Sequence, residues 1–239
     1  MYPKDVPGSP PPVTTHDGVT FRRMPPGADA VYVVGEYRFD DIRPEDVVLD
    51  LGANVGAFCI RAARRSQHVL AVEPILTEAL RENVRTNGAG VTVVGGALGD
   101  GSVGRITWGG KTVTVTTHTL GEIAAMAGGC DFLKCDCEGA EWSIRPGDLD
   151  GVRRIEMELH VPPIGGPMNR ALLDYIGEHY DFEIERTPGY DVKGVMGVLH
   201  AVRKNGRRRP ETPSPAPIKT PGIPGDTANH RQPGPGRHT

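Results

Sequence analysis

The sequence lacks the features that define several large protein classes. It has no apolar run of 18 residues and no signal peptide, so we predict a cytoplasmic protein without a membrane span. Only four residues are cysteine, and none belongs to a CxxC pair with zinc-ligand spacing, so no residue is assigned as a metal ligand. We interpret all four as small buried thiols in a reducing compartment: Cys59, Cys130, Cys135 and Cys137.

Large apolar residues are also scarce, and the deficit lies at the two ends of the chain. Hydrophobic residues make up 38% of the 239 residues, and 15 of the 22 prolines fall in residues 1–26 and 204–239. A proline-rich tail cannot bury enough apolar surface to offset the entropy of ordering it. We therefore predict an extended Pro-rich segment (1–26), one folded domain (27–203) and a disordered Pro/Arg-rich tail (204–239).

Positive charge is lacking where the chain is expected to fold. The formal net charge is −3, but the tail carries seven Lys or Arg residues against two acidic ones, and residues 1–26 add +1. Residues 27–203 therefore carry about −9, which argues against a nucleic-acid backbone as the main partner. We interpret the arginine run at 207–209 as a solvated part of the tail, with contact to nucleic acid or an acidic surface as the alternative.

Against this background, residues 47–56 (VVLDLGANVG) are the most informative stretch. An apolar run ends in Asp50, a Gly-x-x-x-Gly turn follows, and a helical pattern begins. This is typical of a parallel strand that enters a helix through a glycine loop, where an open α/β sheet binds a nucleotide-like ligand. We expect Gly52 and Gly56 to supply the turn and to let a ligand lie against the main chain. The loop matches neither G-x-G-x-x-G nor the P-loop, since no Lys-Ser/Thr pair follows Gly56.

The second apolar run helps to identify the ligand. It spans residues 68–72 and ends at Glu73, 21 residues beyond Gly52, where a carboxylate can accept hydrogen bonds from ribose hydroxyls. A dinucleotide would need a second close-approach glycine for its pyrophosphate, and the chain has Asn54 at that position. The Asn54 side chain can instead bond the amino acid end of S-adenosylmethionine, so we favour this methyl donor over NAD.

The middle of the chain alternates strands and helices. Alternating β and α elements with a final hairpin predict an α/β, doubly wound sheet with a mixed edge. The predicted strands are 46–51, 68–73, 91–95, 130–136 and 153–159, and the predicted helices are 55–65, 75–86, 119–126 and 169–179. A hairpin pairs 105–108 with 112–117, and a closing antiparallel pair joins 182–186 to 197–202.

Acidic residues follow the fourth predicted strand, in residues 132–141 (FLKCDCEGAE). The first and fourth strands are expected neighbours at the switch point of the sheet, which places Asp136 and Glu138 close to the loop at 52–56. Acids there can orient an acceptor hydroxyl, take its proton, or hold a divalent cation. The alternative is an acid-rich helix start, which accounts for Glu141 and Glu138 better than for Asp136.

A third cluster ends the fifth predicted strand. Glu156, Glu158 and His160 share one face by alternation, and Val161 before Pro162 must be extended. His160 therefore lies at the carboxyl edge, as a candidate proton acceptor or as a structural histidine bonded to a backbone carbonyl. We expect the two glutamates to pair with Lys134, Arg153 or Arg154, or to face the crevice.

These pieces together resemble the FkbM-type methyltransferases, a class I S-adenosylmethionine-dependent family. The matching pieces are residues 48–56, 72–74 (VEP), Asn83, Asn87, 97–99 (ALG) and 132–141, the last resembling the family's K-x-D-x-E-G-A-E signature. The resemblance covers roughly residues 30–160. Its departures are Leu120-Gly121 in place of Leu-Asp and the cysteines beside Asp136, both on the acceptor side.

The resemblance implies a Rossmann-like, seven-stranded, mostly parallel sheet with helices on both faces and the donor over the first two strands. It implies that Glu73 holds the ribose and that Ala97 lies near the adenine. The residues that it places at the donor are Asp50, Gly52, Ala53, Asn54, Gly56, Glu73, Pro74, Ala97 and Asp136.

We therefore predict an S-adenosylmethionine-dependent methyltransferase that methylates a hydroxyl on a sugar or a small natural-product-like acceptor by direct in-line transfer. Asp136 and Glu138 would orient the acceptor or bind a divalent cation, and His160 would be the base. The acceptor is expected to be a small molecule or glycan, without membrane contact. Residues 1–46 and 161–200 would shape its pocket, and Tyr37, Tyr190 and Trp142 either line it or pack in the core.

Three alternatives stay open. An RNA or DNA methyltransferase acting on an amino group would need a polar-Pro-Pro-aromatic segment after the fourth strand, and the chain has DCEG there. An NAD-dependent oxidoreductase would bind a dinucleotide in the same loop. A non-catalytic module would keep the donor pocket without turnover.

Overall fold

The computed structural model describes residues 11–22, 35–186 and 192–204. The predicted tail beyond residue 204, most of the predicted N-terminal extension and Tyr190 lie outside these ranges.

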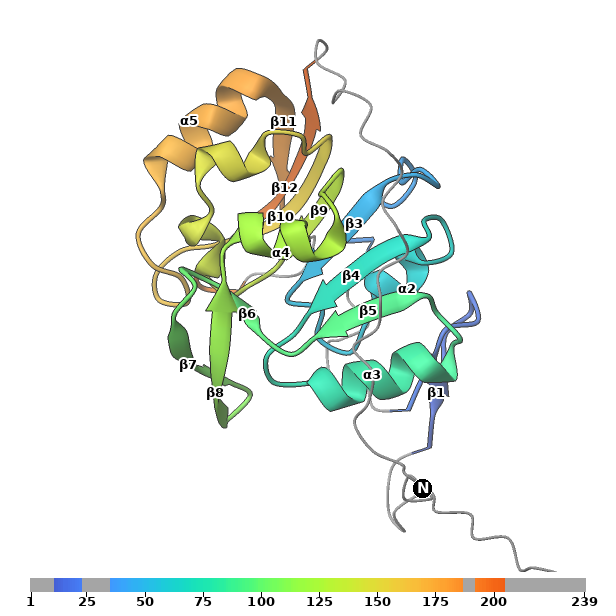
Figure 1. Cartoon of the computed structure of the whole chain (residues 1–239). Coiled ribbons are helices and arrows are strands. Elements are labelled where there is room, and N and C mark those ends of the chain that lie inside the picture. Colours follow the sequence, from blue (N-terminus) through green and yellow to red (C-terminus); the bar gives the residue numbers. More distant parts are fainter. Residues whose placement is uncertain (1–10, 23–34, 187–191, 205–239) are drawn as a thin grey trace, which may run out of the picture.

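A seven-stranded sheet forms the centre of the protein, in the order β11-β12-β10-β9-β3-β4-β5 (Figure 1). All strands run parallel except β12, which is antiparallel to both β10 and β11. The sheet is therefore mixed, as the closing antiparallel pair predicted. The strands are β3 (Val47–Leu51), β4 (His68–Val72), β5 (Val91–Val94), β9 (Phe132–Cys135), β10 (Arg154–His160), β11 (Tyr180–Glu185) and β12 (Val195–Arg203).

Helices follow most of the parallel strands. They are α2 (Cys59–Ala62), α3 (Thr77–Thr86), α4 (Leu120–Ala127) and α5 (Arg170–His179), with 3-10 turns η1 (Ala140–Ser143) and η2 (Pro146–Leu149). The predicted helix over 55–65 is wrong in length, because Gly56 has φ +95° and the regular helix begins only at Cys59. Thr119 caps α4 in a capping box. Within the described residues, no helix is long and apolar enough to cross a bilayer.

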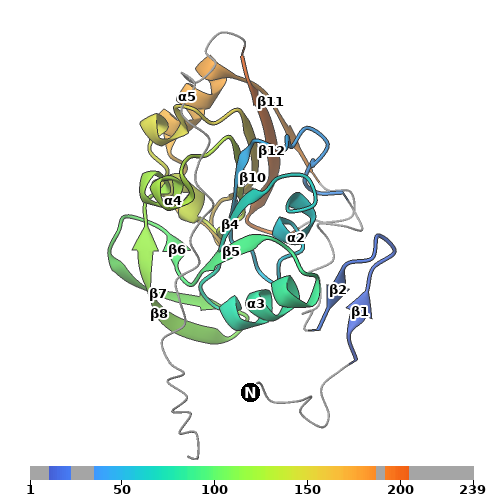
Figure 2. The same ribbon diagram turned by 45° about the vertical axis from the view of Figure 1, so that its right-hand side comes forward.

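The sheet buries a different side-chain set on each face, as strand alternation requires. Leu49, Leu133 and Met157 pack with residues of α4 and α5 on one face. Val48 and Phe132 pack with residues of α2 and α3 on the other. Figure 2 shows the helix pairs on opposite sides of the strands. The central strands β3, β9 and β10 are buried on both sides, so polar side chains within them need partners in the protein.

A separate three-stranded sheet stands below the carboxyl edge of the main sheet in Figure 1. It consists of β6 (Ala97–Leu98), β7 (Val103–Trp108) and β8 (Lys111–His118) in the order β6-β8-β7. The predicted hairpin is confirmed and is longer than expected. Gly109 and Gly110 form its tip with φ values of +55° and +75°, the left-handed pair that suits a two-residue hairpin turn.

A second hairpin, β1 (Val13–Thr14) and β2 (Thr20–Phe21), packs on α3 (Figure 2). The Asn87 side chain accepts from Thr20 N at 2.9 Å and donates to Thr20 O at 2.8 Å, and Asn83 Oδ1 accepts from Arg22 N at 2.9 Å. Phe21 is buried in the core beneath. Residues within the predicted N-terminal extension are thus part of the packed structure, and the two asparagines hold them there.

We predict that Asn87→Ala lowers the free energy of unfolding by about 1–3 kcal/mol. The N–H and the carbonyl of Thr20 would each lose their hydrogen bond to the Asn87 side chain. Urea denaturation would measure the loss. The matched control is Thr86→Ala, at the exposed end of α3, for which a change within about 0.5 kcal/mol is expected. Equal stability of both variants would show that the hairpin contact contributes nothing.

Candidate active site

Two loops meet at the carboxyl ends of adjacent strands. Residues 52–56 follow β3 and residues 136–139 follow β9, and β3 pairs with β9 on one side and β4 on the other. The Asp136 N–H donates to Leu51 O at 3.0 Å, and the Gly52 N–H donates to Val72 O at 3.0 Å. The expected proximity of the first and fourth predicted strands is therefore confirmed.

A cavity of about 700 Å³, partly open to solvent, lies at this edge. Six residues that the resemblance placed at the donor line it: Gly52, Asn54, Glu73, Pro74, Ala97 and Asp136. Glu138 also lines it, whereas Asp50, Ala53 and Gly56 lie outside the lining residues.

The two loop glycines are required by contacts within the chain. Gly52 has φ +72°, and a Cβ there would lie 1.8 Å from the Asp136 carbonyl oxygen. At Gly56, with φ +95°, a Cβ would lie 2.8 Å from Leu80 Cδ1. The Cβ position of each glycine is filled by the protein itself, so both glycines are needed for packing within the chain. Gly52 also lines the cavity and Gly56 does not, so the expected contact of a ligand with the main chain stays a prediction at Gly52.

Glu73 is held rigidly at the cavity wall. Its Oε1 accepts from the N–H groups of Ile75 (2.7 Å) and Leu76 (2.8 Å), and its Oε2 accepts from Asn54 N (2.9 Å). Burial raises the pKa of Glu73, and the three backbone donors oppose that shift. With three of about four acceptor sites in use, the carboxylate can accept one more hydrogen bond from a ligand.

Asn54 offers an unsatisfied acceptor. Its backbone is left-handed (φ +52°), which is tolerated best by glycine and asparagine. Its Oδ1 is buried and has no hydrogen-bond partner within the described part of the chain. An orphaned buried acceptor costs about 1–3 kcal/mol, so a donor group on a ligand would relieve the cost.

Lys134 lies buried beneath the loops and links the two strands. Its Nζ forms an ion pair with Asp50 at 3.1 Å and donates to Gly52 O at 2.9 Å. Burial alone would lower the pKa of Lys134, but the charges of Asp50 and Asp136 outweigh it and raise the pKa. The Tyr37 hydroxyl donates to Asp136 Oδ2 at 3.1 Å and fixes that carboxylate from the other side. Asp50 is thus the partner of Lys134 and has no surface on the cavity.

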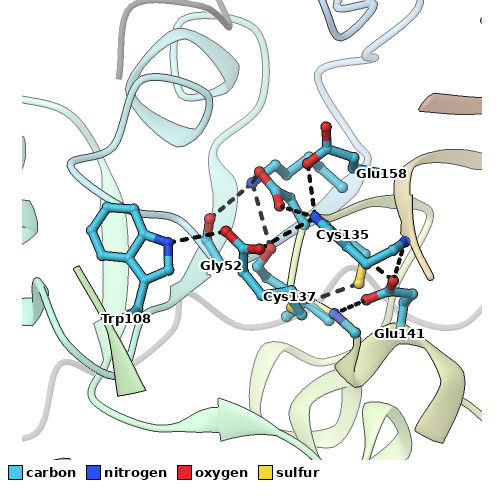
Figure 3. Close-up of polar contacts among 12 residues, drawn as sticks. Gly52, Trp108, Cys135, Cys137, Glu141 and Glu158 are labelled. Carbon is cyan, nitrogen blue, oxygen red and sulfur yellow. Dashed lines mark hydrogen bonds and ion pairs between the residues drawn. The ribbon is translucent and has the colours of Figure 1, made fainter. Parts of the chain in front are cut away.

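His160 stands among four carboxylates, of which Figure 3 labels Glu141 and Glu158. Its Nδ1 lies 3.1 Å from Glu141, and its Nε2 lies 3.1 Å from Glu158, 3.5 Å from Glu138 and 3.9 Å from Asp136. Burial opposes the charged ring, but the hydrogen bonds to Glu141 and Glu158 outweigh it and raise the pKa of His160 to about 11.

The predicted role of His160 as the base does not fit this environment. A ring with that pKa is protonated at neutral pH and has no free lone pair. Its partner is a carboxylate and not the backbone carbonyl of the alternative interpretation. Trp142 Nε1 donates to His160 O at 2.6 Å, so Trp142, like Tyr37, is a buried hydrogen-bonding residue and not part of the cavity wall.

The neighbouring Glu156 belongs to a different group. It pairs with Arg154, as expected, and its Oε2 also accepts from Arg38 N at 3.0 Å and lies 2.6 Å from His200 Nδ1. Arg154 is thus the expected partner that Glu156 takes, whereas Glu158 pairs with His160.

Sequence reasoning missed Trp108 and Glu36. Trp108, at the tip of the β7–β8 hairpin, lines the cavity and donates from Nε1 to Glu138 Oε1 at 3.0 Å (Figure 3). The sequence predicts the hairpin but carries no signal for where its tip lies. Burial, followed by the charges of Glu158 and Asp136, raises the pKa of Glu36 to about 7.

Asp136, Glu138 and His160 offer ligand atoms within 4.8 Å of one another, the spacing that one divalent cation could bridge. Such an ion would have to displace the proton that Glu141 and Glu158 stabilise on His160. The cation therefore stays a prediction.

The comparisons with known proteins identify this arrangement. Residues 50–184, more than half of the chain, match the model of the methyltransferase FkbM domain. The chain belongs to the FkbM methyltransferase family. The matched residues include both loops that build the site: the loop after β3 and the acidic loop after β9.

Individual known proteins also resemble parts of this FkbM methyltransferase. A 23S rRNA (uracil(1939)-C(5))-methyltransferase of Klebsiella pneumoniae is 50% identical over 50 residues, which are 20% of this chain and only 12% of that protein. The structure of M. jannaschii TYW2 in complex with AdoMet has a TM-score of 0.50 at 17% identity and covers 85% of this chain and 90% of that one. This likeness shows the fold. Magnesium protoporphyrin IX methyltransferase from Synechocystis, with bound SAM, has a TM-score of 0.42 at 15% identity over 67% of this chain and 71% of that one.

We predict that Gly52→Ala destabilises the FkbM domain by about 3 kcal/mol or more, because the new Cβ would overlap the Asp136 carbonyl. Gly18→Ala is the matched control: Gly18 has a similar φ of +81° and open space around it, so only the cost of the left-handed alanine, about 1–2 kcal/mol, remains. Denaturant unfolding of both variants would separate the cost of a left-handed alanine from the cost of the overlap between the Cβ and the Asp136 carbonyl. Equal losses would contradict the close approach of the two loops.

The protonation of His160 gives a second prediction. At pH 8 both ring nitrogens should carry a proton in long-range ¹H–¹⁵N NMR spectra, with His160→Gln used to assign the signals. Because the pKa is raised from 6.5 to about 11, the stability that this charge contributes is fully present below pH 6.5 and is lost as the pH rises through 11. A neutral ring at pH 8 would restore the candidate base.

Proposed function

We propose that the protein transfers the methyl group of S-adenosylmethionine to a hydroxyl of a sugar or a small natural-product-like acceptor. One observation carries the donor assignment: two acceptor groups lie side by side on the cavity wall. They are the buried amide oxygen of Asn54, which has no hydrogen-bond partner among the described residues, and the fixed carboxylate of Glu73. Membership of the FkbM family and the AdoMet complex of the M. jannaschii protein support the same donor.

The lining residues fit the chemical parts of this donor. Asn54 Oδ1 would accept from the ammonium of its amino acid end, and the remaining acceptor site of Glu73 would accept from a ribose hydroxyl. Trp108 and Ile106 supply apolar surface for a base. When bound, the donor supplies an activated methyl group on a sulfonium, so the chain contributes mainly orientation and exclusion of water, worth at most about 7–11 kcal/mol.

The acidic residues beside the cavity fit a hydroxyl acceptor. Asp136 and Glu138 line the cavity and can accept a hydrogen bond from a hydroxyl, which orients its oxygen lone pair. The proton then goes to a carboxylate and not to His160, which is already protonated. Glu36, with a pKa of about 7, is matched to such a transfer at neutral pH.

A nucleic-acid acceptor is the second candidate, favoured by the match to the rRNA methyltransferase. The carboxylates of Asp136, Glu138 and Glu158 oppose it, because they repel phosphates at the place where a base would have to enter. A salt-sensitive gel shift with RNA, absent from a control protein of equal charge, would favour this candidate over a small acceptor.

Calorimetry tests the donor. We expect the purified protein to bind S-adenosylhomocysteine, with NAD failing to compete. Asn54→Ala and Glu73→Gln should each weaken binding about tenfold or more, the cost of one lost hydrogen bond in a buried site. Glu78→Gln, on the exposed side of α3, should leave the affinity unchanged. Binding of NAD in preference to S-adenosylhomocysteine would overturn the assignment and favour an oxidoreductase.

Methyl transfer tests the acceptor side. With a pool of sugars and hydroxylated small molecules, release of S-adenosylhomocysteine should fall about 10²–10⁴-fold in Asp136→Asn while donor affinity changes little. Donor binding without transfer to any acceptor would support the non-catalytic module. Full activity in excess EDTA would exclude the predicted cation.

A further inference from the structure

We propose that Cys135 and Cys137 form a redox-active dithiol. Its oxidation to an intrachain disulfide would displace residues of the donor cavity and weaken donor binding. The effect on the donor rests on the proposed function, whereas the disulfide itself does not.

The two sulfurs are already in contact. Cys135 Sγ, at the end of β9, lies 3.7 Å from Cys137 Sγ in the loop that follows. Figure 3 shows the two side chains next to each other beside the acidic group. A disulfide has an S–S length of about 2.05 Å, so the sulfurs need to approach by roughly 1.7 Å.

The pair is accessible from one side. Cys135 is fully buried at the end of β9, whereas Cys137 is half-buried and lines the cavity. The expectation that all four cysteines are buried therefore fails at Cys137. Cys59 and Cys130 are buried and are absent from the cavity wall, so neither shares this combination.

The geometry supports a two-step exchange with a low-molecular-weight disulfide such as oxidised glutathione. The Cys137 thiolate attacks one oxidant sulfur, forms a mixed disulfide and releases the other sulfur as a thiolate, which takes up the proton. Cys135 then loses its proton, attacks Cys137 Sγ and releases the second glutathione thiol. Two cysteine thiols are oxidised, and one oxidant disulfide is reduced to two thiols.

When the disulfide forms, the backbone must move in the loop at residues 136–139 and not in strand β9. Cys135 is paired with Leu51 of β3 on one side and Met157 of β10 on the other. Cys137 precedes two residues with left-handed backbone, Glu138 (φ +53°) and Gly139 (φ +106°), outside any strand. The movement therefore belongs to residues 136–139.

That loop forms part of two cavity contacts. The Asp136 carbonyl fills the space beside Gly52, and Glu138 accepts the hydrogen bond of Trp108. A shift of Cys137 by more than an ångström displaces both. The donor loop and the hairpin tip would therefore lose their fixed separation.

The test compares reduced protein with protein treated with oxidised glutathione. We expect the oxidised protein to lose two hydrogen atoms in mass, mapped to the tryptic peptide 135–153, which contains only these two cysteines. Its affinity for S-adenosylhomocysteine should fall at least tenfold and return with dithiothreitol. Cys137→Ser should show the same affinity before and after treatment, and Cys130→Ala should respond as the wild type does. Cys135→Ala lacks the resolving thiol, so it should retain one glutathione as a mixed disulfide on Cys137 and form no intrachain disulfide.

Tryptophan fluorescence gives a readout that needs no ligand. Oxidation should change the emission of the wild type and leave that of Trp108→Phe unchanged, because Trp108 is bonded to the moving loop. Failure of the reduced protein to bind S-adenosylhomocysteine would contradict the proposed function alone. Absence of the 135–137 disulfide, or a disulfide that alters neither affinity nor Trp108 emission, would overturn the inference.

Discussion

The buried pair of Lys134 and Asp50 is the interaction on which the site depends. It joins β9 to β3 at the switch point, and the same ammonium holds the Gly52 carbonyl where the donor loop begins. A charge buried on one strand requires its partner on the other, because a carboxylate or ammonium left alone there would cost several kcal/mol. Both loops that build the cavity therefore start from one fixed point. Gly52 and the Asp136 carbonyl approach each other closely beside this pair.

The polar residues of β9 and β10 occupy one face of the sheet and separate into two groups. Toward the strand start, Arg154, Glu156 and His200 satisfy one another. Toward the carboxyl end, Glu158 and His160 meet Asp136 at the cavity. A closed network stabilises the fold without binding anything, whereas an open one retains capacity for a ligand. Position along the strand, and not residue type, decides which glutamate belongs to the site.

The sequence predicted the parts of the site that depend on local pattern. The glycine loop, Glu73 after β4 and Asp136 after β9 follow from strand ends in an open α/β sheet, and all reach the cavity edge. The sequence did not predict contacts between segments that are distant along the chain. Trp108 reaches Glu138 across thirty positions, and Asn87 holds Thr20 across sixty-seven. The charge on His160 depends on four carboxylates from two strand ends, so alternation located the residue but gave the wrong protonation state.

The charges around His160 also bear on which class of methyl acceptor the site can take. On the cavity side, Asp136, Glu138 and Glu158 face the His160 imidazolium. The Lys134 ammonium lies 4.0 Å from Asp136 but is already paired with Asp50, so carboxyl groups outnumber the positive charges that can neutralise them. A hydroxyl that becomes methylated must give up its proton, and a site with surplus carboxylate can receive it without a neutral histidine. A phosphate-bearing acceptor would meet the same surplus as repulsion. This excess of carboxylate therefore favours the chemistry of a neutral hydroxyl and opposes a nucleic-acid backbone, and it arises from residues at the carboxyl ends of two adjacent strands, β9 and β10.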